Sequence, residues 1–568
     1  MRRREKKKSI FPAILLVLAI LAIFAGAGII LSKIGLLDAI KLPEKEAVEA
    51  GPAPVENWQK GYLAGSGNNV TVCDKFLYPV SSLPRGTEVN YLVDENGAAK
   101  FIYEDNEYYI KEERIAAEKS ACVLESTLFV RTATNLLDEN GNLTDCLANK
   151  GDELKVIGCN YLNEDGSANM LKVQLGAKEG FVSPKYLVNN KPLALVNYDH
   201  NGAYATHLER IDEYSGGRAD NLDYFPREKG NFENNVMPEQ CRTLYICSWR
   251  VDEVDTYLEV AKDSAINAFC VDITDGTAIG YSSPVMEKYS PTTAENAYFT
   301  VEEYAACIKK IKDAGYYVIG RITTFNDEYF VKDHPECAIK DMQGNPFDLQ
   351  ATYWPSAYNR YAWQYKVDLA LEAIELMGFN EIQYDYVRFP DMTDRYDAMG
   401  IIDYGNAYGE TKAQAIQRFL MYATDRIHEA GAYISADVFG ESAFTYVTAY
   451  GQYWPAISTV VDAVSGMPYP DHFDESGDYK PWEHPYNTLY NWGLSVAERQ
   501  KETSSPAKVR TWLQAYDAIR EPYNYYGANE IAEQINGLKD AGVFDGFLTW
   551  HSGAEPYKYL DQIDGYSA

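Results

Sequence analysis

The sequence predicts a mixed α/β protein whose C-terminal part, residues 241–568, folds as a (β/α)8 TIM barrel. From Cys241 onward, strand-like and helix-like segments alternate, as expected when helices join parallel strands. Upstream, residues 59–118 and 119–190 each carry several short alternating strands, which predicts two small all-β modules. An uncharged run over residues 10–32 predicts an N-terminal transmembrane helix.

The N-terminal segment has the charge pattern of a membrane anchor. A basic tail, residues 1–9, precedes an apolar run long enough to cross about 30 Å of hydrocarbon as a helix. The tail is expected to stay in the cytoplasm, so the body of this single-pass membrane protein is expected outside the cell. A cleaved signal peptide is the alternative, but its apolar core is ordinarily only about 7–15 residues long. Residues 33–58, rich in Pro and Glu, predict an extended linker.

Composition argues against nucleic acid as a partner, and the motifs give no indication of a metal site. The formal net charge is −31, and nucleic acid phosphates would repel such an acidic chain. The 46 tyrosines suit stacking on sugar faces, although tyrosine also fills strands. Nine cysteines cannot all pair within one chain, and a bridge among Cys122, Cys146 and Cys159 stays open. The histidines form no H-E-x-x-H motif and no Gly-rich phosphate loop follows the first barrel strand, so we expect neither metal nor cofactor.

The two β modules repeat one layout. Each has a glycine turn (Gly86, Gly151), a short strand after it, a later aromatic strand and a one-turn stop. The second copy resembles bacterial SH3 domains, with residues 128–131 as the early strand and 180–182 as the late strand. The first copy is a weaker match. This SH3-like resemblance implies binding to cell-wall peptides or glycans, peptidoglycan among them; the alternative is a spacer between membrane and barrel. Residues 191–240 predict an irregular connector.

Eight strands are expected in the barrel, with helical segments between most of them. They are Thr243–Trp249, Ala265–Ile273, Tyr316–Thr323, Asn380–Phe389, Tyr433–Phe439, Val460–Gly466, Val509–Ala515 and Phe544–Trp550. Three of the helices end in Ala-Gly, which fits a left-handed C-cap before the next strand. A doubly wound open sheet is the alternative, but this chain lacks the Gly-rich turn that such a sheet can carry after its first strand.

Polar side chains gather where the predicted strands end. The fourth strand alternates Glu381, Gln383 and Asp385 with apolar residues and then reaches Arg388. The other strand ends supply carboxylates, aromatic rings and donors: Trp249, Asp272, Arg321, Asp437, Glu441, Tyr469, Trp512, Gln514 and Trp550. Because the C-terminal ends of barrel strands share one rim, we expect these groups to meet. Paired carboxyls beside aromatic rings are typical of a sugar-cleaving site.

These segments resemble the putative glycosyl hydrolase domain of exported bacterial proteins, a TIM-barrel family distantly similar to alpha-amylase-type hydrolases. The matching pieces are residues 378–390, 435–440, 467–470 and 512–515. The resemblance implies glycoside hydrolysis. The chain departs from the family at Asp471, where we expect Ser before the histidine, and this changes the hydrogen bonding expected there.

Catalytic roles follow from two carboxyls in different protonation states. Asp385 is predicted to be the ionised one, favoured by Arg388, and to act as nucleophile or base. The acid is Asp437, which points inward with Ser435, or Glu441 in the following loop; both stay open.

Substrate binding is predicted for seven further residues: Asp272, Arg321, Arg388, Trp249, Tyr469, Gln514 and Trp550. For Asp272, a structural tie to the barrel backbone or to Arg321 is an equal alternative.

The function predicted is a membrane-anchored extracytoplasmic glycoside hydrolase acting on a cell-envelope or extracellular polysaccharide. The alternative is a non-catalytic glycan- or cell-wall-binding protein on the same scaffold. That alternative predicts no carboxyl pair within about 5–10 Å.

Overall fold

The computed structural model describes residues 58–349 and 351–568. The predicted tail, anchor and nearly all of the linker therefore lie outside the described residues. Within the described part, every helix is too short or too polar to cross a membrane. The chain divides into two compact units, Met1–Gln59 and Lys60–Ala568, and the second contains both β modules and the barrel.

The two β modules share one strand order, which confirms the repeat. The first module has the sheet order β3-β2-β6-β5-β4-β1-β7 and the second β10-β9-β13-β12-β11-β8-β14, identical position by position. The first comprises β1 (Gln59–Leu63), β2 (Asn69–Cys73), β3 (Pro79–Pro84), β4 (Glu88–Val93), β5 (Ala98–Tyr103), β6 (Asn106–Lys111) and β7 (Ile115–Ala116). The second comprises β8 (Ser126–Val130), β9 (Thr134–Leu137), β10 (Leu143–Ala148), β11 (Glu153–Cys159), β12 (Leu171–Leu175), β13 (Lys178–Val182) and β14 (Leu187–Val188).

Alternation of side chains builds these sheets. In β11, Leu154 and Val156 are buried while Glu153 and Lys155 are exposed, the period of two that a half-buried strand requires. The predicted one-turn stop before the last strand is present in both copies, as η1 (Glu112–Arg114) and η3 (Pro184–Tyr186). The N-terminal region is therefore all-β, and the SH3-like assignment stays a prediction.

The connector is less irregular than predicted. It contains α2 (Lys191–Leu195), α3 (Ala203–Glu209) and η4 (Ala219–Asn221). Lys229 donates to the carbonyls of Ser458 and Val461, and Arg210 forms a buried ion pair with Glu502. These long-range contacts, which sequence spacing does not reveal, fasten the connector to the barrel.

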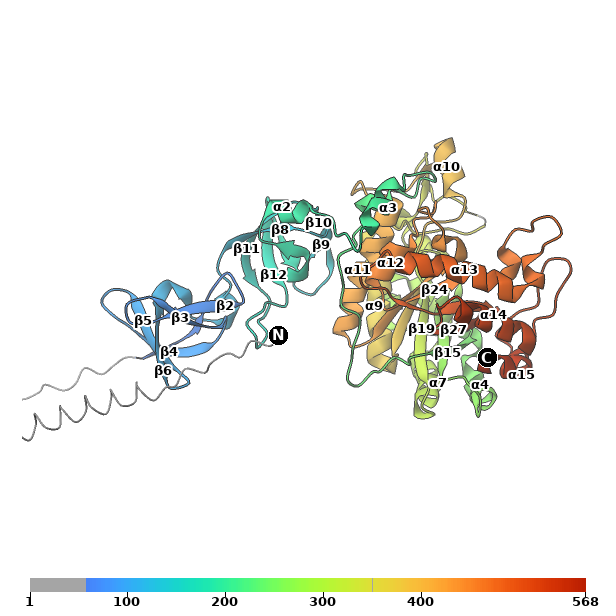
Figure 1. Ribbon diagram of the computed structural model, residues 1–568, viewed down its shortest axis with the longest axis horizontal. Coiled ribbons are helices and arrows are strands. Elements are labelled where there is room, and N and C mark those ends of the chain that lie inside the picture. The colour runs from blue at the N-terminus through green and yellow to red at the C-terminus, as the bar shows by residue number, and fades with distance from the viewer. Residues whose placement is uncertain (1–57, 350) are drawn as a thin grey trace, which may run out of the picture. The chain divides into compact units, whose positions relative to one another are not determined.

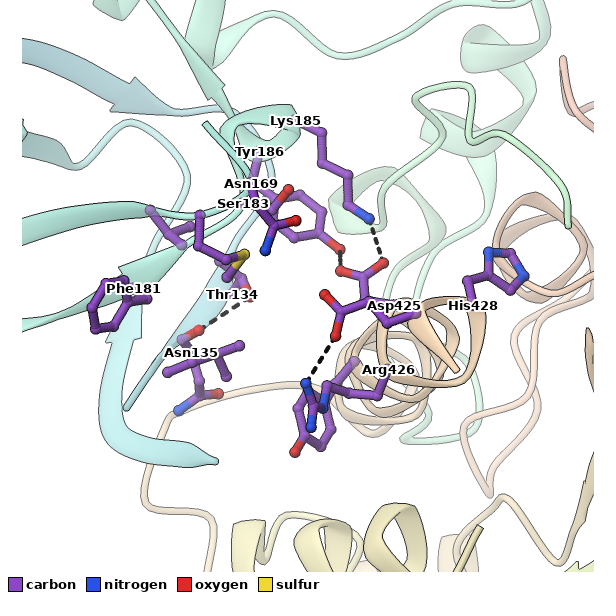
Figure 2. Close-up of a pocket in the computed structure, with 15 residues that line it drawn as sticks. Thr134, Asn135, Asn169, Phe181, Ser183, Lys185, Tyr186, Asp425, Arg426 and His428 are labelled. Atoms are coloured by element: carbon purple, nitrogen blue, oxygen red, sulfur yellow. Dashed lines mark hydrogen bonds and ion pairs between the residues drawn. The ribbon is translucent and has the colours of Figure 1, made fainter. Parts of the chain in front are cut away.

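The second module contacts the outside of the barrel at helix α11 (Lys412–Glu429). Asp425 on α11 accepts hydrogen bonds from Lys185, from the Tyr186 hydroxyl at 2.6 Å and from Arg227 at 3.0 Å. Figure 2 shows this junction around a cavity of about 330 Å³, with α11 on one side and strands of the second module on the other. This cavity lies against an outer helix, so it is distinct from the strand ends of the barrel.

The barrel is a ring of nine parallel strands. Its order is β25-β24-β23-β21-β19-β16-β15-β27-β26, and Figure 1 shows helices packed around it. The strands are β15 (Cys241–Ile246), β16 (Ala268–Asp275), β19 (Tyr317–Thr323), β21 (Glu381–Asp385), β23 (Tyr433–Phe439), β24 (Ala463–Met467), β25 (Lys508–Val509), β26 (Thr511–Gln514) and β27 (Gly546–Trp550). Only Arg510 separates β25 from β26; β25 pairs with β24 and β26 with β27, so together they hold the seventh of eight positions.

The outer helices follow the predicted pattern. They include α4 (Val254–Ala261), α7 (Val301–Asp313), α9 (Arg360–Met377), α13 (Pro485–Gln500), α14 (Ala528–Asp540) and α15 (Pro556–Gln562). The glycines of the three Ala-Gly ends, Gly315, Gly431 and Gly542, have φ of 87°, 77° and 75°. This left-handed conformation costs glycine nothing, so each helix stops and the chain enters the next strand.

The interior of the ring is polar, as the fourth strand predicts. Glu381 forms an ion pair with Arg510 and accepts a hydrogen bond from Tyr317 at 2.9 Å, and all three side chains are buried. One layer higher, Gln383 donates to Ser465 at 3.0 Å. Branched apolar residues ordinarily fill such barrels. Here buried polar groups satisfy one another instead, and they lead up to the strand ends.

All nine cysteines lie in the described part and are free thiols. The bridge left open among Cys122, Cys146 and Cys159 is therefore absent from this structure. Burial raises the pKa of Cys122 to about 11, as expected for a thiol that packs as a small apolar group.

Candidate active site

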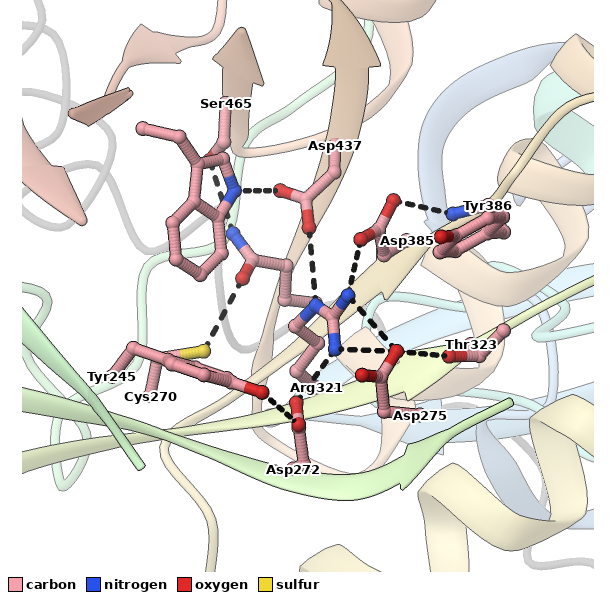
Figure 3. Close-up of polar contacts among 12 residues, drawn as sticks. Tyr245, Cys270, Asp272, Asp275, Arg321, Thr323, Asp385, Tyr386, Asp437 and Ser465 are labelled. Carbon is pink, nitrogen blue, oxygen red and sulfur yellow. Dashed lines mark hydrogen bonds and ion pairs between the residues drawn. The ribbon is translucent and has the colours of Figure 1, made fainter. Parts of the chain in front are cut away.

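One buried arginine collects the carboxylates at the strand ends (Figure 3). The Arg321 guanidinium on β19 lies 2.7 Å from Asp272 of β16 and 2.5 Å from Asp385 of β21. Its Nε lies 3.7 Å from Asp437 of β23, and Asp275 lies 3.3 Å away. The predicted residues from the second, third, fourth and fifth strands therefore meet at one point.

Strand register explains why they meet. Asp272 aligns with Arg321, and Arg321 with Gln383, so these three residues share one layer. Gln383 also aligns with Ser435, which places Asp385 and Asp437, two residues further along each strand, in the next layer up. The long arginine side chain spans the step between the layers. It therefore touches both.

The cluster holds more negative charge than its single cation can balance. Asp272 and Asp437 have no exposed surface. Burial raises the pKa of Asp272 to about 7. Burial, and then the charge of Asp385, raise the pKa of Asp437 well above its usual range. A buried carboxyl without a full counter-charge favours its protonated form, so Asp437 holds its proton more tightly than an exposed aspartate does.

Two residues that donate hydrogen bonds to the carboxyls were not identified from the sequence. The Tyr245 hydroxyl donates to Asp272, and Trp512 Nε1 donates to Asp437 Oδ1 at 2.8 Å. The alternation of side chains along the first and seventh strands could have identified them. Tyr245 and Trp512 each lie two residues from another residue that points into the barrel, so they point inward as well. Asp437 Oδ2 and Arg321 Nε have no hydrogen-bond partner among residues 58–349 and 351–568. Asp437 thus has one oxygen fixed and one left for a proton.

The backbone turns sharply after Asp385. Tyr386 has φ of 48°, in the left-handed region that non-glycine residues rarely adopt, and its N–H donates to Asp385 Oδ1 at 2.6 Å. Such strain costs about 1–3 kcal/mol and is typical of functional sites. Asp385 therefore accepts from a backbone N–H and from a guanidinium, and both donors stabilise negative charge on it.

Arg388 is not the cation beside Asp385. It pairs with Asp391 at 3.0 Å and lies over the ring of Phe439 at 4.3 Å. The predicted strand continued to Phe389, whereas β21 ends at Asp385, because the left-handed turn at Tyr386 breaks the alternation. Arg321 supplies the charge that was expected from Arg388.

Glu441 belongs to a different group of side chains. It lies in η7 (Gly440–Ala443) after β23 and accepts hydrogen bonds from the hydroxyls of Tyr450 and Tyr446, the second at 3.4 Å. Its side chain is half-buried. The structure therefore brings Asp385 together with Asp437 on one guanidinium, a pairing that the non-catalytic alternative did not expect.

Gln514 and Asp471 join two loops rather than face the opening. Gln514 is fully buried; its Oε1 accepts from Asp471 N at 3.1 Å. Asp471 accepts from the Tyr516 hydroxyl at 2.7 Å and from Ile519 N at 3.2 Å. The departure at Asp471 thus provides a carboxylate that ties the loop after β24 to the loop after β26.

Aromatic rings cover the cluster from several strands. Trp550 lies 5.5 Å from the Arg321 guanidinium and is half-buried. Tyr469 is 5% exposed, and burial, followed by the charges of Tyr516, Asp385 and Asp437, raises its pKa well above the usual value. Trp249 is 40% exposed and its ring contacts Tyr298 rather than the cluster.

The solved structures that resemble this chain include glycan-acting enzymes and a hypothetical protein. The glycoside hydrolase domain of PgaB (BpsB) from Bordetella bronchiseptica is 12% identical and covers 58% of this chain and 99% of its own, with a TM-score of 0.42. A GH18 chitinase from Pseudoalteromonas aurantia is 11% identical over 57% of this chain and 99% of its own, with a TM-score of 0.35. A hypothetical protein from Ruminiclostridium thermocellum ATCC 27405 is 31% identical over 34% of this chain and 97% of its own, with a TM-score of 0.29.

No curated protein matches the chain. The family described as "Putative glycosyl hydrolase domain" matches residues 243–557, which is more than half of the sequence and nearly the whole barrel. The chain therefore belongs to this glycosyl hydrolase domain family.

Proposed function

We propose that the barrel is a glycoside hydrolase that uses Asp385 and Asp437 as its carboxyl pair. The observation that carries the proposal is their shared position on Arg321, at the ends of neighbouring strands and in contrasting surroundings. Family membership supports the reaction class. Glycoside cleavage needs one ionised and one protonated carboxyl, and environment decides which is which.

Asp385 takes the ionised role. Its oxygens accept from Arg321 and from the N–H of Tyr386, so it serves as nucleophile in a retaining mechanism or as base in an inverting one. Asp437, whose raised pKa keeps its proton, gives that proton to the departing oxygen. Glu441 is the alternative acid, because its half-buried carboxyl is nearer to solvent.

The substrate is a polysaccharide without strong negative charge. Four carboxyl groups share one guanidinium in the cluster, and the chain carries a net charge of −31, so an anionic polymer would be repelled. The proposed setting is the cell envelope. In this proposal the apolar segment of residues 10–32 anchors the protein in the membrane with its body outside, and the β modules contact peptidoglycan or serve as a spacer.

The test is hydrolysis of a panel of neutral and amine-bearing polysaccharides by the full chain. Asp385→Asn and Asp437→Asn are each expected to lose more than about 1,000-fold in kcat, since each removes a carboxyl from the reaction itself. Asp313→Asn is the matched control. Asp313 lies exposed at the end of α7, just before β19 begins, and therefore at the face of the barrel opposite the strand ends.

Glu441→Gln separates the two candidate acids. A loss as large as that of Asp437→Asn, together with retained turnover of Asp437→Asn, would reassign the acid to Glu441. Equal turnover by wild type, Asp385→Asn and Asp437→Asn would refute the carboxyl pair. Absence of turnover across the whole panel would refute the hydrolase proposal.

A further inference from the structure

Exposed and half-buried aromatic rings follow the strand ends of the barrel on both sides of the carboxyl cluster. They are Trp249 and Tyr298 at one end, Trp550 in the middle, and Tyr516 and His472 at the other end. We call these five residues the aromatic row. Trp249 and Tyr298 are 40% and 52% exposed, and the side chain of His472 is 57% exposed. Trp550 and Tyr516 are half-buried.

The order of strands places this row opposite the acids. Trp249 follows β15, and Tyr298 lies on β18 (Ala297–Thr300), which pairs with β17 (Ala278–Ser282) beyond the end of β16. Trp550 ends β27, Tyr516 follows β26 and His472 follows β24. We number the positions of the ring from β15 as one, through β16, β19, β21, β23, β24 and the pair β25 and β26, to β27 as eight. The row then runs over positions two, one, eight, seven and six. Asp385 and Asp437 come from positions four and five, across the opening.

The two ends of the row are built alike. At one end the rings of Trp249 and Tyr298 lie 6.4 Å apart, edge to face. At the other end Tyr469 packs edge to face against both His472, at 5.1 Å, and Tyr516, at 6.1 Å, and thereby holds their orientation. Between them, Trp550 lies over Arg321 and packs against Trp512 at 5.8 Å. Each site offers an apolar ring face beside polar groups, which is what a sugar ring requires.

A single sugar needs only the middle of this row. Trp550 already lies over Arg321, the guanidinium that both carboxyls share, so rings at positions two and six add nothing for a terminal unit held there. They lie on opposite sides of the cleavage point, because positions two and six are four apart in a ring of eight. Only a ligand that extends both ways from the carboxyl pair reaches both ends.

We propose that the site binds an internal stretch of a polysaccharide, with sugar units stacked on the aromatic row on both sides of the bond that is cut. This inference rests on the proposed hydrolase function and adds that cleavage is internal and that rings beyond the carboxyl cluster hold the sugar units on either side. Tyr298 becomes a substrate-binding residue, presented by the strand pair that extends β16.

The experiment compares a polysaccharide that the full chain cleaves with a nitrophenyl glycoside of the same sugar. Wild type is expected to lower the viscosity of the polymer well before reducing ends accumulate. Trp249→Ala/Tyr298→Ala and, separately, His472→Ala are each expected to lower the ratio of kcat/KM on the polymer to kcat/KM on the short glycoside by about tenfold, the worth of a lost ring stack. Leu376→Ala, at a 49% exposed residue near the end of the outer helix α9, is the control.

Folding is checked by thermal unfolding, and Trp249→Phe/Tyr298→Phe is expected to restore the ratio because it keeps both rings. A ratio equal to that of the control in both variants overturns the inference and leaves the hydrolase proposal standing. If wild type cleaves nothing, the hydrolase proposal fails, and binding of the same polymers in affinity electrophoresis decides this inference. Weaker binding by both variants then supports it, and binding equal to the control overturns it.

Discussion

The stability of the barrel should depend on pH through Asp272, and the size of the effect follows from its surroundings. Asp272 is fully buried, and its pKa in the folded chain is about 7 against an ordinary value of 3.8. The folded state therefore binds this proton more tightly than the unfolded state does. Its contribution to stability is fully present below pH 4 and is lost as the pH rises through 7. At 1.36 kcal/mol per unit of pKa, the loss amounts to about 4 kcal/mol.

Asp272→Asn removes this proton and with it the pH dependence. The amide keeps the size of the carboxyl, although it weakens the contacts with Tyr245 and Arg321 by an amount that does not vary with pH. Between pH 4 and pH 7, the free energy of unfolding of Asp272→Asn should therefore rise relative to wild type by about 3 kcal/mol, because wild type still keeps half of this proton at pH 7.

Urea unfolding followed by tryptophan fluorescence is the assay, because every tryptophan except Trp58 lies in the barrel region. Asp313→Asn serves as the control, since this carboxylate lies on the surface at the end of α7. Stability curves of wild type and Asp272→Asn that stay parallel from pH 4 to pH 7 would refute the claim that burial holds the Asp272 proton.

Three further outcomes are expected. Trp512→Phe removes the donor to Asp437, so the pKa of Asp437 should rise further and the alkaline limb of the kcat profile should move to higher pH; a profile that superimposes on wild type would contradict the contact's role. Glu381→Ala leaves Arg510 buried without its partner and should cost about 3–5 kcal/mol in urea unfolding, whereas a cost below about 1 kcal/mol would show that Arg510 finds another partner. Alginate, a polyuronate, should bind more weakly than chitosan in affinity electrophoresis at low salt, and the difference should shrink at high salt; equal binding at low salt would remove the charge argument.

Much of the barrel was predictable because its signals are local. The fifth strand has the bounds that were predicted, Tyr433–Phe439, and Asp437 points inward with Ser435 as alternation requires. The Ala-Gly helix ends adopt the left-handed conformation because glycine alone takes it without cost. Both features depend on a few adjacent residues, so the sequence carries them directly.

The partners within the site were not predictable, because they depend on register between strands. Asp385 was matched with Arg388, three residues away, but the cation that reaches it is Arg321, which lies 64 positions earlier and one layer lower in the ring. Nothing near Tyr386 announces its left-handed backbone, which turns Arg388 away. The strand pair that carries Tyr298 was also unforeseen, since it consists of two short strands inserted after β16.

The central claim is that Asp385 acts directly on the sugar, opposite a protonated Asp437. The most direct measurement is turnover by Asp385→Ala with and without added azide, on a polysaccharide that wild type cleaves. A small anion can occupy the space of the missing carboxylate and attack the sugar in its place. The account predicts loss of turnover without azide and partial recovery with a glycosyl azide product, while wild-type turnover by Asp385→Ala without azide would contradict it.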